Sequence, residues 1–168
     1  VLVRENDIKY IIYSDGKNGS LFPLLQKMER EKTPCLKQII SMTEMVHKAE
    51  TTDAKDRGML RRMEETLSCD DVISILFTSG TSGRAKGVML THYNLVNNAA
   101  GMVERMHWSR SDVMCTAVPL FHCFGVTVGI LGAICSGASL RLLPCFSSTE
   151  ALEVIEKYRC TVFNGVPT

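Results

Sequence analysis

The sequence predicts an α/β fold, with largely parallel sheet layers flanked by helices. The C-terminal third alternates predicted strands and helices, and this alternation is typical of a parallel sheet with crossover helices. The strands there are apolar along their length, as strands are when helices cover both faces of a sheet. At 168 residues and 45% hydrophobic, the chain can bury one sizeable core and has the length of a single domain.

The first part of the chain predicts strands and helices in turn. Residues 8–13 are rich in β-forming side chains and are followed by the turn signal Ser14-Asp15-Gly16. Ser20 can cap a helix that places its leucines on one face. After it we predict a strand over 36–41, a loop or weak helix over 43–56, and a helix over 55–67 with a solvated charged face.

The rest of the chain is more regular. An apolar strand over 72–77 leads into a loop rich in glycine and hydroxyl groups, and residues 88–90 are typical of a short strand. Thr91 can cap a helix over 92–106, and Ser147 with Glu150 has the spacing of a capping box. The remaining predicted strands are 113–118, 139–143 and 161–164, and the remaining helices are 123–135 and 151–158.

The loop after residue 77 is suited to holding phosphate. It reads Thr78-Ser79-Gly80-Thr81-Ser82-Gly83-Arg84-Ala85-Lys86-Gly87. Glycines let backbone N–H groups approach an anion, the hydroxyls add donors, and Lys86 and Arg84 supply positive charge. The loop therefore predicts nucleotide chemistry, although a Gly/Ser/Thr-rich segment taken alone is more often an ordinary turn.

The loop does not follow the Walker pattern of P-loop proteins. That pattern needs a glycine, four residues and then Gly-Lys-Ser/Thr at the start of a helix. Counted from Gly80, Ala85 stands where the second glycine belongs and Gly87 stands where the magnesium-binding hydroxyl belongs. Since a short strand follows as well, a P-loop kinase or GTPase ranks last among the alternatives.

With Phe77 in front of it, the loop resembles the signature of the adenylate-forming superfamily, which includes acyl-CoA synthetases, luciferases and the adenylation domains of peptide synthetases. Ser82 replaces a usual threonine and keeps its hydroxyl, whereas Ala85 replaces a usual proline and removes a backbone constraint. Pro119-Leu120-Phe121-His122 and Gly165-Val166-Pro167-Thr168 are similar to two further segments of acyl-CoA synthetases, in the same order. The resemblance covers at least residues 71–168.

The resemblance implies a fragment of an ATP-dependent acyl-CoA synthetase. Residues 1–168 would be a partial N-terminal nucleotide- and acyl-binding domain, with the small C-terminal domain absent from the chain. A carboxylate would attack the α-phosphate of ATP to give acyl-adenylate and pyrophosphate, and coenzyme A thiolate would then displace AMP. The implied cofactors are ATP, Mg²⁺ and coenzyme A as co-substrate, and the implied substrate is a small carboxylic acid, fatty or aryl.

The resemblance also implies the site residues. The residues that would wrap the phosphates are Thr78, Ser79, Gly80, Thr81, Ser82, Gly83, Lys86 and Gly87, with Thr81 also at the metal. Lys86 and His122 are the implied catalytic residues, Lys86 as a point charge and His122 as a side chain lining the carboxylate or acyl-adenylate site. His122 would position the substrate, because a carboxylate nucleophile is ionised at neutral pH and needs no base. A histidine beside Phe121 and Phe124, taken alone, is more often a packed side chain.

Parallel sheets bind ligands beyond the carboxyl ends of their strands. We therefore expect the phosphate loop, the Phe121-His122 segment and residues 165–168 to lie together at one edge of the sheet.

Other function classes stay open. Another adenylate-forming enzyme, such as a peptide-synthetase adenylation domain or a luciferase-like oxygenase, would share the loop, and a non-catalytic nucleotide-binding module would need nothing more than the loop. The family's Tyr-Gly-x-Thr-Glu adenine loop, ribose-binding aspartate, hinge and late lysine fall outside the 168 residues. We therefore expect the isolated chain to be inactive in adenylation.

Composition limits which binding partners and which cellular location we expect. Nineteen Lys and Arg against eighteen Asp and Glu leave a net charge of +1, so no nucleic acid is expected to bind. Seven cysteines without a Cys-x-x-Cys pair predict reduced thiols, and those in apolar runs, such as Cys123 and Cys135, are expected to be buried. The apolar run 124–135 is too short for a transmembrane segment. The expected location is cytoplasmic, and the sequence leaves the oligomeric state unknown.

Overall fold

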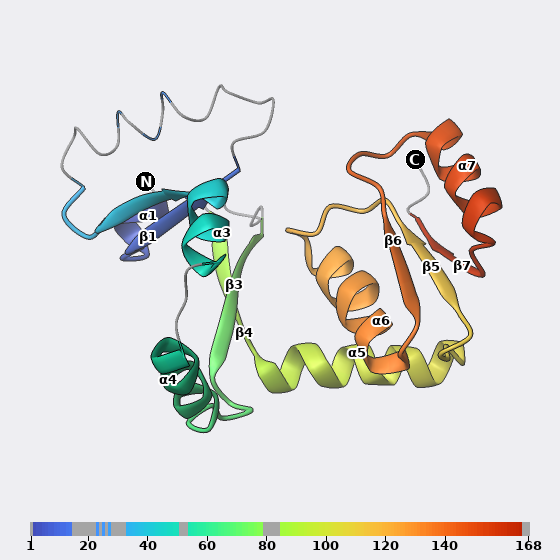
Figure 1. Cartoon of the computed structure of the whole chain (residues 1–168), viewed down its shortest axis with the longest axis horizontal. Coiled ribbons are helices and arrows are strands. Elements are labelled where there is room, and N and C mark those ends of the chain that lie inside the picture. Colours follow the sequence, from blue (N-terminus) through green and yellow to red (C-terminus); the bar gives the residue numbers. More distant parts are fainter. Residues whose placement is uncertain are drawn as a thin grey trace. The chain divides into compact units, whose positions relative to one another are not determined.

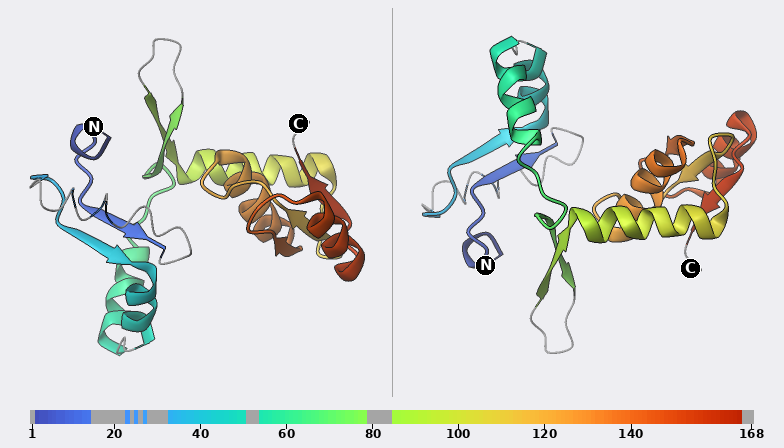
Figure 2. Two further views of the ribbon diagram at one scale, coloured as in Figure 1. Left: turned by 90° about the horizontal axis from the view of Figure 1, so that it is seen from above. Right: turned by 90° about the horizontal axis from the view of Figure 1, so that it is seen from below.

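The computed structural model describes residues 2–14, 23, 25, 27, 33–50, 54–78 and 85–165 (Figure 1). The chain divides into two compact units, Val1–Thr66 and Leu67–Thr168. Figure 2 gives two further views of the ribbon. Most of the helix predicted after Ser20 lies outside the described residues.

The first unit contains a small parallel sheet. The helix α1 (Leu2–Glu5) precedes β1 (Tyr10–Tyr13), which pairs in parallel with β2 (Gln38–Ser41). Both predicted strands are thus confirmed. Two helices follow, α3 (Met42–Glu50) and α4 (Ala54–Glu64). The first forms where we predicted a loop or weak helix, because Ser41 Oγ accepts a hydrogen bond from the Glu44 N–H at 3.0 Å, as an N-cap does.

The second unit begins with an antiparallel hairpin. Strand β3 (Val72–Thr78) pairs with β4 (Lys86–Thr91), and Thr78 lies opposite Lys86. The prediction that the phosphate loop joins two strands is confirmed. The hairpin is a separate two-stranded sheet, however, so the loop does not belong to the carboxyl edge of the parallel sheet as we expected. The short connection explains this, since parallel pairing would need a crossover of a dozen or more residues.

Helix α5 (His92–Met106) starts directly after β4, as predicted. Thr91 Oγ1 accepts from the Asn94 N–H at 3.2 Å, and Asn94 Oδ1 accepts from the Thr91 N–H at 3.1 Å. These reciprocal bonds form a capping box. The helix ends at His107, whose φ is 56°, and the Trp108 N–H donates to Val103 O at 3.0 Å. This left-handed ending turns Trp108 into the core.

A three-stranded parallel sheet forms the centre of the second unit. Strand β5 (Val113–Thr116) lies between β6 (Ser139–Leu142) and β7 (Val162–Asn164), which confirms the predicted parallel sheet. Met114 of β5 is fully buried in a cluster with Trp108, Val128 and Ala133. Figure 1 shows the helices of this cluster on one side of the sheet and α7 (Ser148–Tyr158) on the other. Ser147 caps α7 by accepting from the Glu150 N–H at 3.3 Å, which is one half of the predicted capping box.

The helix predicted over 123–135 is present, but its first part is a π-helix. The π-helical segment η1 (Phe124–Leu131) is followed by α6 (Gly132–Ser136). A run that is apolar on all sides contains no signal that distinguishes an α-helix from a π-helix. π-Helical turns occur frequently at functional sites. No helix in the described part of the chain is both long and apolar enough to span a bilayer.

All seven cysteines are free, and Cys115 is buried. Burial raises the pKa of the Cys115 thiol, and the neighbouring Cys160 raises it further. The expectation for Cys123 and Cys135 was wrong, because both are exposed. Cys123 lies ahead of η1 and Cys135 lies on the solvent side of α6, and an apolar run does not reveal which of its residues faces outward.

Asp112 ties the turn before β5 to the start of β7. Its Oδ1 accepts from the Thr161 hydroxyl at 2.7 Å, and its Oδ2 accepts from the Ser109 N–H at 2.7 Å. The hydrogen bond from Thr161, followed by that from Ser109, lowers the pKa of Asp112 below its ordinary value of 3.8. The ionised form of this carboxylate therefore stabilises the folded chain.

This lowered pKa sets the sign of a pH dependence. The stabilisation is present above the unfolded pKa and is lost as the pH falls through the folded pKa. We expect Asp112→Asn to flatten the fall of the urea midpoint of the 168-residue chain between about pH 5 and pH 2. An unaltered slope in Asp112→Asn would contradict this assignment.

Candidate functional site

Thr78 and Lys86 lie side by side at the loop end of the hairpin. They are register partners, so their Cα atoms are about 5 Å apart. Both residues are exposed, and none of the ion pairs in the described part of the chain involves Lys86. The Lys86 ammonium group is therefore available to an anion.

Side chains of the neighbouring strand β3 explain why position 87 is a glycine. A Cβ at this position would lie 3.0 Å from Cγ2 of Ile75 and 3.3 Å from Cε1 of Phe77. A side chain there would press on the aromatic residue that precedes the loop. Glycine thus lets Phe77 lie across β4 at the base of the loop.

The middle of the phosphate loop lies outside the described residues. This applies to five predicted binding residues, Ser79, Gly80, Thr81, Ser82 and Gly83, and to the role of Thr81 at a metal. These assignments stay predictions. The structure places the other three, Thr78, Lys86 and Gly87, on the two flanks of the loop.

His122 lies in a tight turn between β5 and η1. Its N–H donates to Pro119 O at 3.1 Å, and its carbonyl oxygen accepts from the Val126 N–H at 3.1 Å. The Phe124 N–H donates to Nδ1 of the His122 ring at 3.2 Å. Because a backbone N–H can only donate, Nδ1 is the acceptor, and the neutral ring carries its proton on Nε2. The ring therefore caps η1 through Nδ1, and the residue is exposed, so that its Nε2–H is a donor at the surface.

The turn depends on glycine at position 125. A Cβ at Gly125 would lie 2.3 Å from Pro119 O and 2.9 Å from Cα of Leu120. Both atoms belong to the backbone, so no side-chain rotation would relieve the contact. Glycine is the residue that permits such a close backbone approach.

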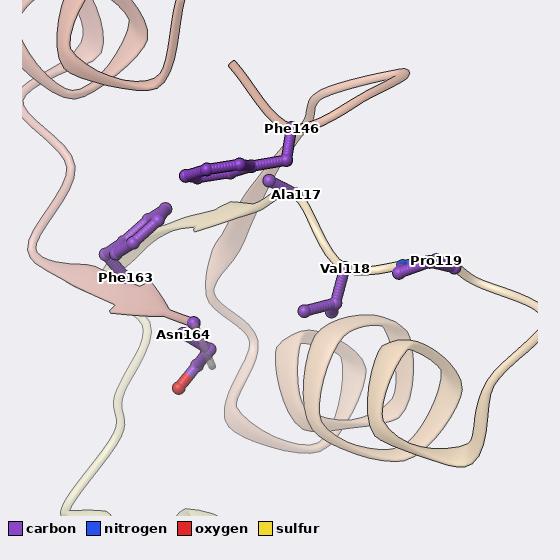
Figure 3. A pocket seen from close by; sticks show the side chains of 7 residues that line it. Ala117, Val118, Pro119, Phe146, Phe163 and Asn164 are labelled. Carbon is purple, nitrogen blue, oxygen red and sulfur yellow. The ribbon is translucent and has the colours of Figure 1, made fainter. Parts of the chain in front are cut away.

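A small apolar pocket opens at the carboxyl edge of the parallel sheet (Figure 3). Its volume is about 210 Å³, and it is lined by Ala117, Val118, Pro119, Phe146, Phe163, Asn164 and Gly165. In Figure 3 the rings of Phe146 and Phe163 point toward one another at the ends of β5 and β7. Pro119, which precedes the Phe121-His122 segment, and Gly165 both line this pocket, whereas Phe121 and His122 do not, and residues 166–168 lie outside the described residues. We name this feature the edge pocket.

A second, more open hollow of about 620 Å³ lies on the other side of the start of η1. It is bordered by β4, α5 and η1, through Leu90, Asn94, Leu95, Asn98, Cys123, Phe124, Thr127 and Val128.

The sequence did not reveal the aromatic and polar walls of the edge pocket. Phe146 comes directly before the capping residue Ser147, a position that gave no functional signal. Asn164 ends an otherwise apolar strand, and a polar side chain at the carboxyl end of a parallel strand is a signal that could have identified it.

The fold matches part of the N-terminal domain of adenylate-forming enzymes. The chain superposes on the crystal structure of ATP-bound MatB from Rhodopseudomonas palustris with a TM-score of 0.75 and 25% identity. The superposition covers 99% of this chain and 31% of MatB. Residues 1–168 match the family model described as AMP-binding enzyme. The chain belongs to this family.

The curated relatives are acyl-CoA synthetases and ligases by name. The chain is 36% identical, over 192 aligned residues, to "Putative acyl-CoA synthetase YngI" of Bacillus subtilis (strain 168). This alignment covers 99% of the chain and 34% of YngI. Acyl-CoA ligase SID4 of Ajellomyces capsulatus is 42% identical over 111 residues, which are 65% of this chain and 19% of SID4. The chain thus spans about a third of YngI.

The cap on η1 gives a structural prediction for His122. Asparagine can present an oxygen near the position of Nδ1, whereas alanine presents no acceptor. We expect His122→Ala to speed hydrogen exchange at the Phe124 amide about two- to tenfold, as the loss of one hydrogen bond implies, and His122→Asn to retain most of the protection. Exchange measured by NMR would test this, and equal protection in all three proteins would refute the cap.

Proposed function

We propose that the protein carrying this chain is an ATP-dependent acyl-CoA synthetase. The observation that carries the proposal is the position of the His122 turn, which shares Pro119 with the edge pocket. A carboxylate near Nε2–H of His122 would have its apolar chain within reach of that pocket. The names of the curated relatives YngI and SID4 support the same reaction class.

The hairpin supplies the nucleotide side of the reaction. The first half-reaction brings a carboxylate to a polyanion, so the protein must neutralise phosphate oxygens and hold the attack in line. Lys86 would place its ammonium group on those oxygens, and the Thr78 hydroxyl would donate from the opposite strand. MatB was crystallised with ATP bound, which supports ATP as the nucleotide.

Mg²⁺ fits this half of the site in part. The exposed Thr78 hydroxyl and the loop hydroxyls are oxygen donors of the kind that Mg²⁺ accepts together with phosphate oxygens. Thr81 would be the residue nearest the metal. When bound, Mg²⁺ neutralises the charge that builds up on the phosphates.

His122 would hold the acid. Its Nε2–H would donate to a carboxylate or acyl-adenylate oxygen, while Nδ1 stays occupied by the Phe124 N–H. The ring cannot accept a proton at Nδ1 without losing that bond, so positioning is the role that its contacts favour. Coenzyme A as the second acceptor, and a fatty or aryl acid as the substrate, complete the proposal.

The reaction can be tested through Lys86. We expect Lys86→Ala to lower kcat/KM for carboxylate-dependent ATP–pyrophosphate exchange by about 100-fold or more in the protein that carries this chain, because a charge on the transferring group is lost. Lys86→Arg should retain part of the rate, and Lys157→Ala, on the exposed side of α7, is the matched control. The 168-residue chain alone is expected to show no exchange.

The outcomes separate the alternatives. Undiminished exchange in Lys86→Ala would refute the role of the ammonium group. Exchange without formation of a CoA thioester would favour another adenylate-forming enzyme, such as a peptide-synthetase domain or a luciferase-like oxygenase. ATP binding without adenylate formation for any acid would favour a non-catalytic nucleotide-binding module.

A further inference from the structure

The register of the hairpin changes by one residue along its length. At the loop end Thr78 lies opposite Lys86, whereas at the other end Val72 lies opposite Thr91, which is one residue out of step with the first register. The irregularity falls between Val72 and Ser74 and leaves one extra residue in β3, as a β-bulge does. Two registers thus occur in one pair of strands, and some contact must hold the loop end in the register that it adopts.

This register decides which face of the hairpin Lys86 occupies. Directly paired residues project from the same face, so Lys86 and Thr78 share a face and Phe77 projects from the other. If the register of the far end extended to the loop end, Lys86 would lie opposite Phe77 and on its face. A one-residue slip would therefore separate the two side chains that the proposed function assigns to the phosphates.

Neither the connection nor the apolar pattern specifies the register at the loop end. Residues 79–85 connect the two strands, and this connection is longer than the about two to five residues usual in hairpins. Turn geometry therefore sets the register less strictly than in a tight hairpin. Apolar residues also occur on both faces of the hairpin, and these are Leu76, Val88, Ile75 and Met89. A slip would bring apolar side chains opposite apolar side chains again.

The contact between Phe77 and Gly87 distinguishes the two registers. Gly87 is the one glycine of β4, and a Cβ there would lie 3.3 Å from Cε1 and 3.6 Å from Cζ of the Phe77 ring. An aromatic side chain that covers a glycine of the neighbouring strand helps to fix the pairing of the two strands. In the slipped register Phe77 would lie opposite Lys86, and Gly87 would lie opposite Leu76. The ring is directly opposite the glycine only in the observed register.

We propose that Phe77 is a positioning residue for the reaction, because its ring on Gly87 holds the loop end of the hairpin in the register that pairs Lys86 with Thr78. Phe77 projects from the face opposite to Lys86, so it acts through the pairing of the strands and not by contact with the nucleotide. This inference rests on the proposed function, since it assumes that the Lys86 ammonium group binds phosphate oxygens.

Alanine at position 77 tests the inference in the protein that carries this chain. We expect Phe77→Ala to lower kcat/KM for ATP in carboxylate-dependent pyrophosphate exchange by about fivefold, because a cross-strand contact favours one register by up to a similar factor and a misplaced group loses its effect. The KM for the carboxylic acid should stay within about twofold of its unaltered value. Phe77→Tyr keeps the ring and should retain the rate.

Two further variants separate this contact from a general loss of stability. Gly87→Ala keeps Phe77 but displaces its ring, so we expect a similar fall in kcat/KM for ATP. Met89→Ala is the matched control, because it removes an exposed apolar side chain from the same face of the hairpin, opposite Ile75 instead of Gly87. It should leave kcat/KM for ATP within about twofold of the unaltered value, as is usual for an exposed position.

A double-mutant cycle with Lys86 shows whether Phe77 acts through that residue. If the ring only positions the ammonium group, Phe77→Ala should lower kcat/KM for ATP no further in a protein that already carries Lys86→Ala. A structural role that is independent of Lys86 would lower it by the same factor in both backgrounds.

An unchanged kcat/KM for ATP in Phe77→Ala would overturn the inference, and so would an equal effect in the two backgrounds or an equal fall in Met89→Ala. Should Phe77→Ala fail to fold, the same comparisons made with Gly87→Ala decide the question. If Lys86→Ala itself leaves the exchange undiminished, the proposed role of the ammonium group is refuted and this inference with it.

Discussion

The candidate site depends on one close backbone contact, between η1 and the turn that follows β5. Gly125 allows it, because a Cβ there would lie 2.3 Å from Pro119 O. The contact holds the turn against the π-helix, and the hydrogen bonds of His122 then fix the imidazole ring at the start of that helix. Pro119 extends the same constraint to the edge pocket. Gly125 thus affects both the orientation of the His122 ring and the shape of the edge pocket.

In the proposed function, the same side chain would serve both structure and ligand binding. His122 uses Nδ1 to satisfy a backbone N–H that would have no partner at the start of the helix. This bond leaves Nε2–H as the donor that would bind the acid in the proposed function. The turn follows the central strand of the sheet, in which Met114 and Thr116 are almost fully buried. The turn that carries His122 is thereby anchored next to the core.

Local signals in the sequence predicted much of this fold. The caps at Thr91 and Ser147, the strands β5, β6 and β7 and the loop between two strands all follow from residue types within a few positions of each other. The parallel order of the sheet follows from the alternation of strands and helices. In the site, the sequence pointed to Lys86 and His122, and the structure places both on exposed turns or strand ends.

Features that depend on distant residues were not predictable in the same way. The π-helix reflects contacts of Gly125 and Gly129 with β5 and the turn after it, which no pattern of apolar residues encodes. Phe146 and Asn164 line one pocket because β6 and β7, distant in the sequence, both pair with β5. The exposure of Cys123 and Cys135 has the same origin, since a uniformly apolar run does not specify its outward face.

The most direct test of this account is the kinetics of Gly125→Ala in the protein that carries this chain. Gly101→Ala, on α5, is the control, because a Cβ at Gly101 meets no atom within 4 Å. The account predicts that Gly125→Ala lowers kcat/KM for the carboxylic acid by about 100-fold through misplacement of the turn, with the Kd for ATP unchanged. Unchanged kcat/KM in Gly125→Ala would contradict the claim that this contact positions the site.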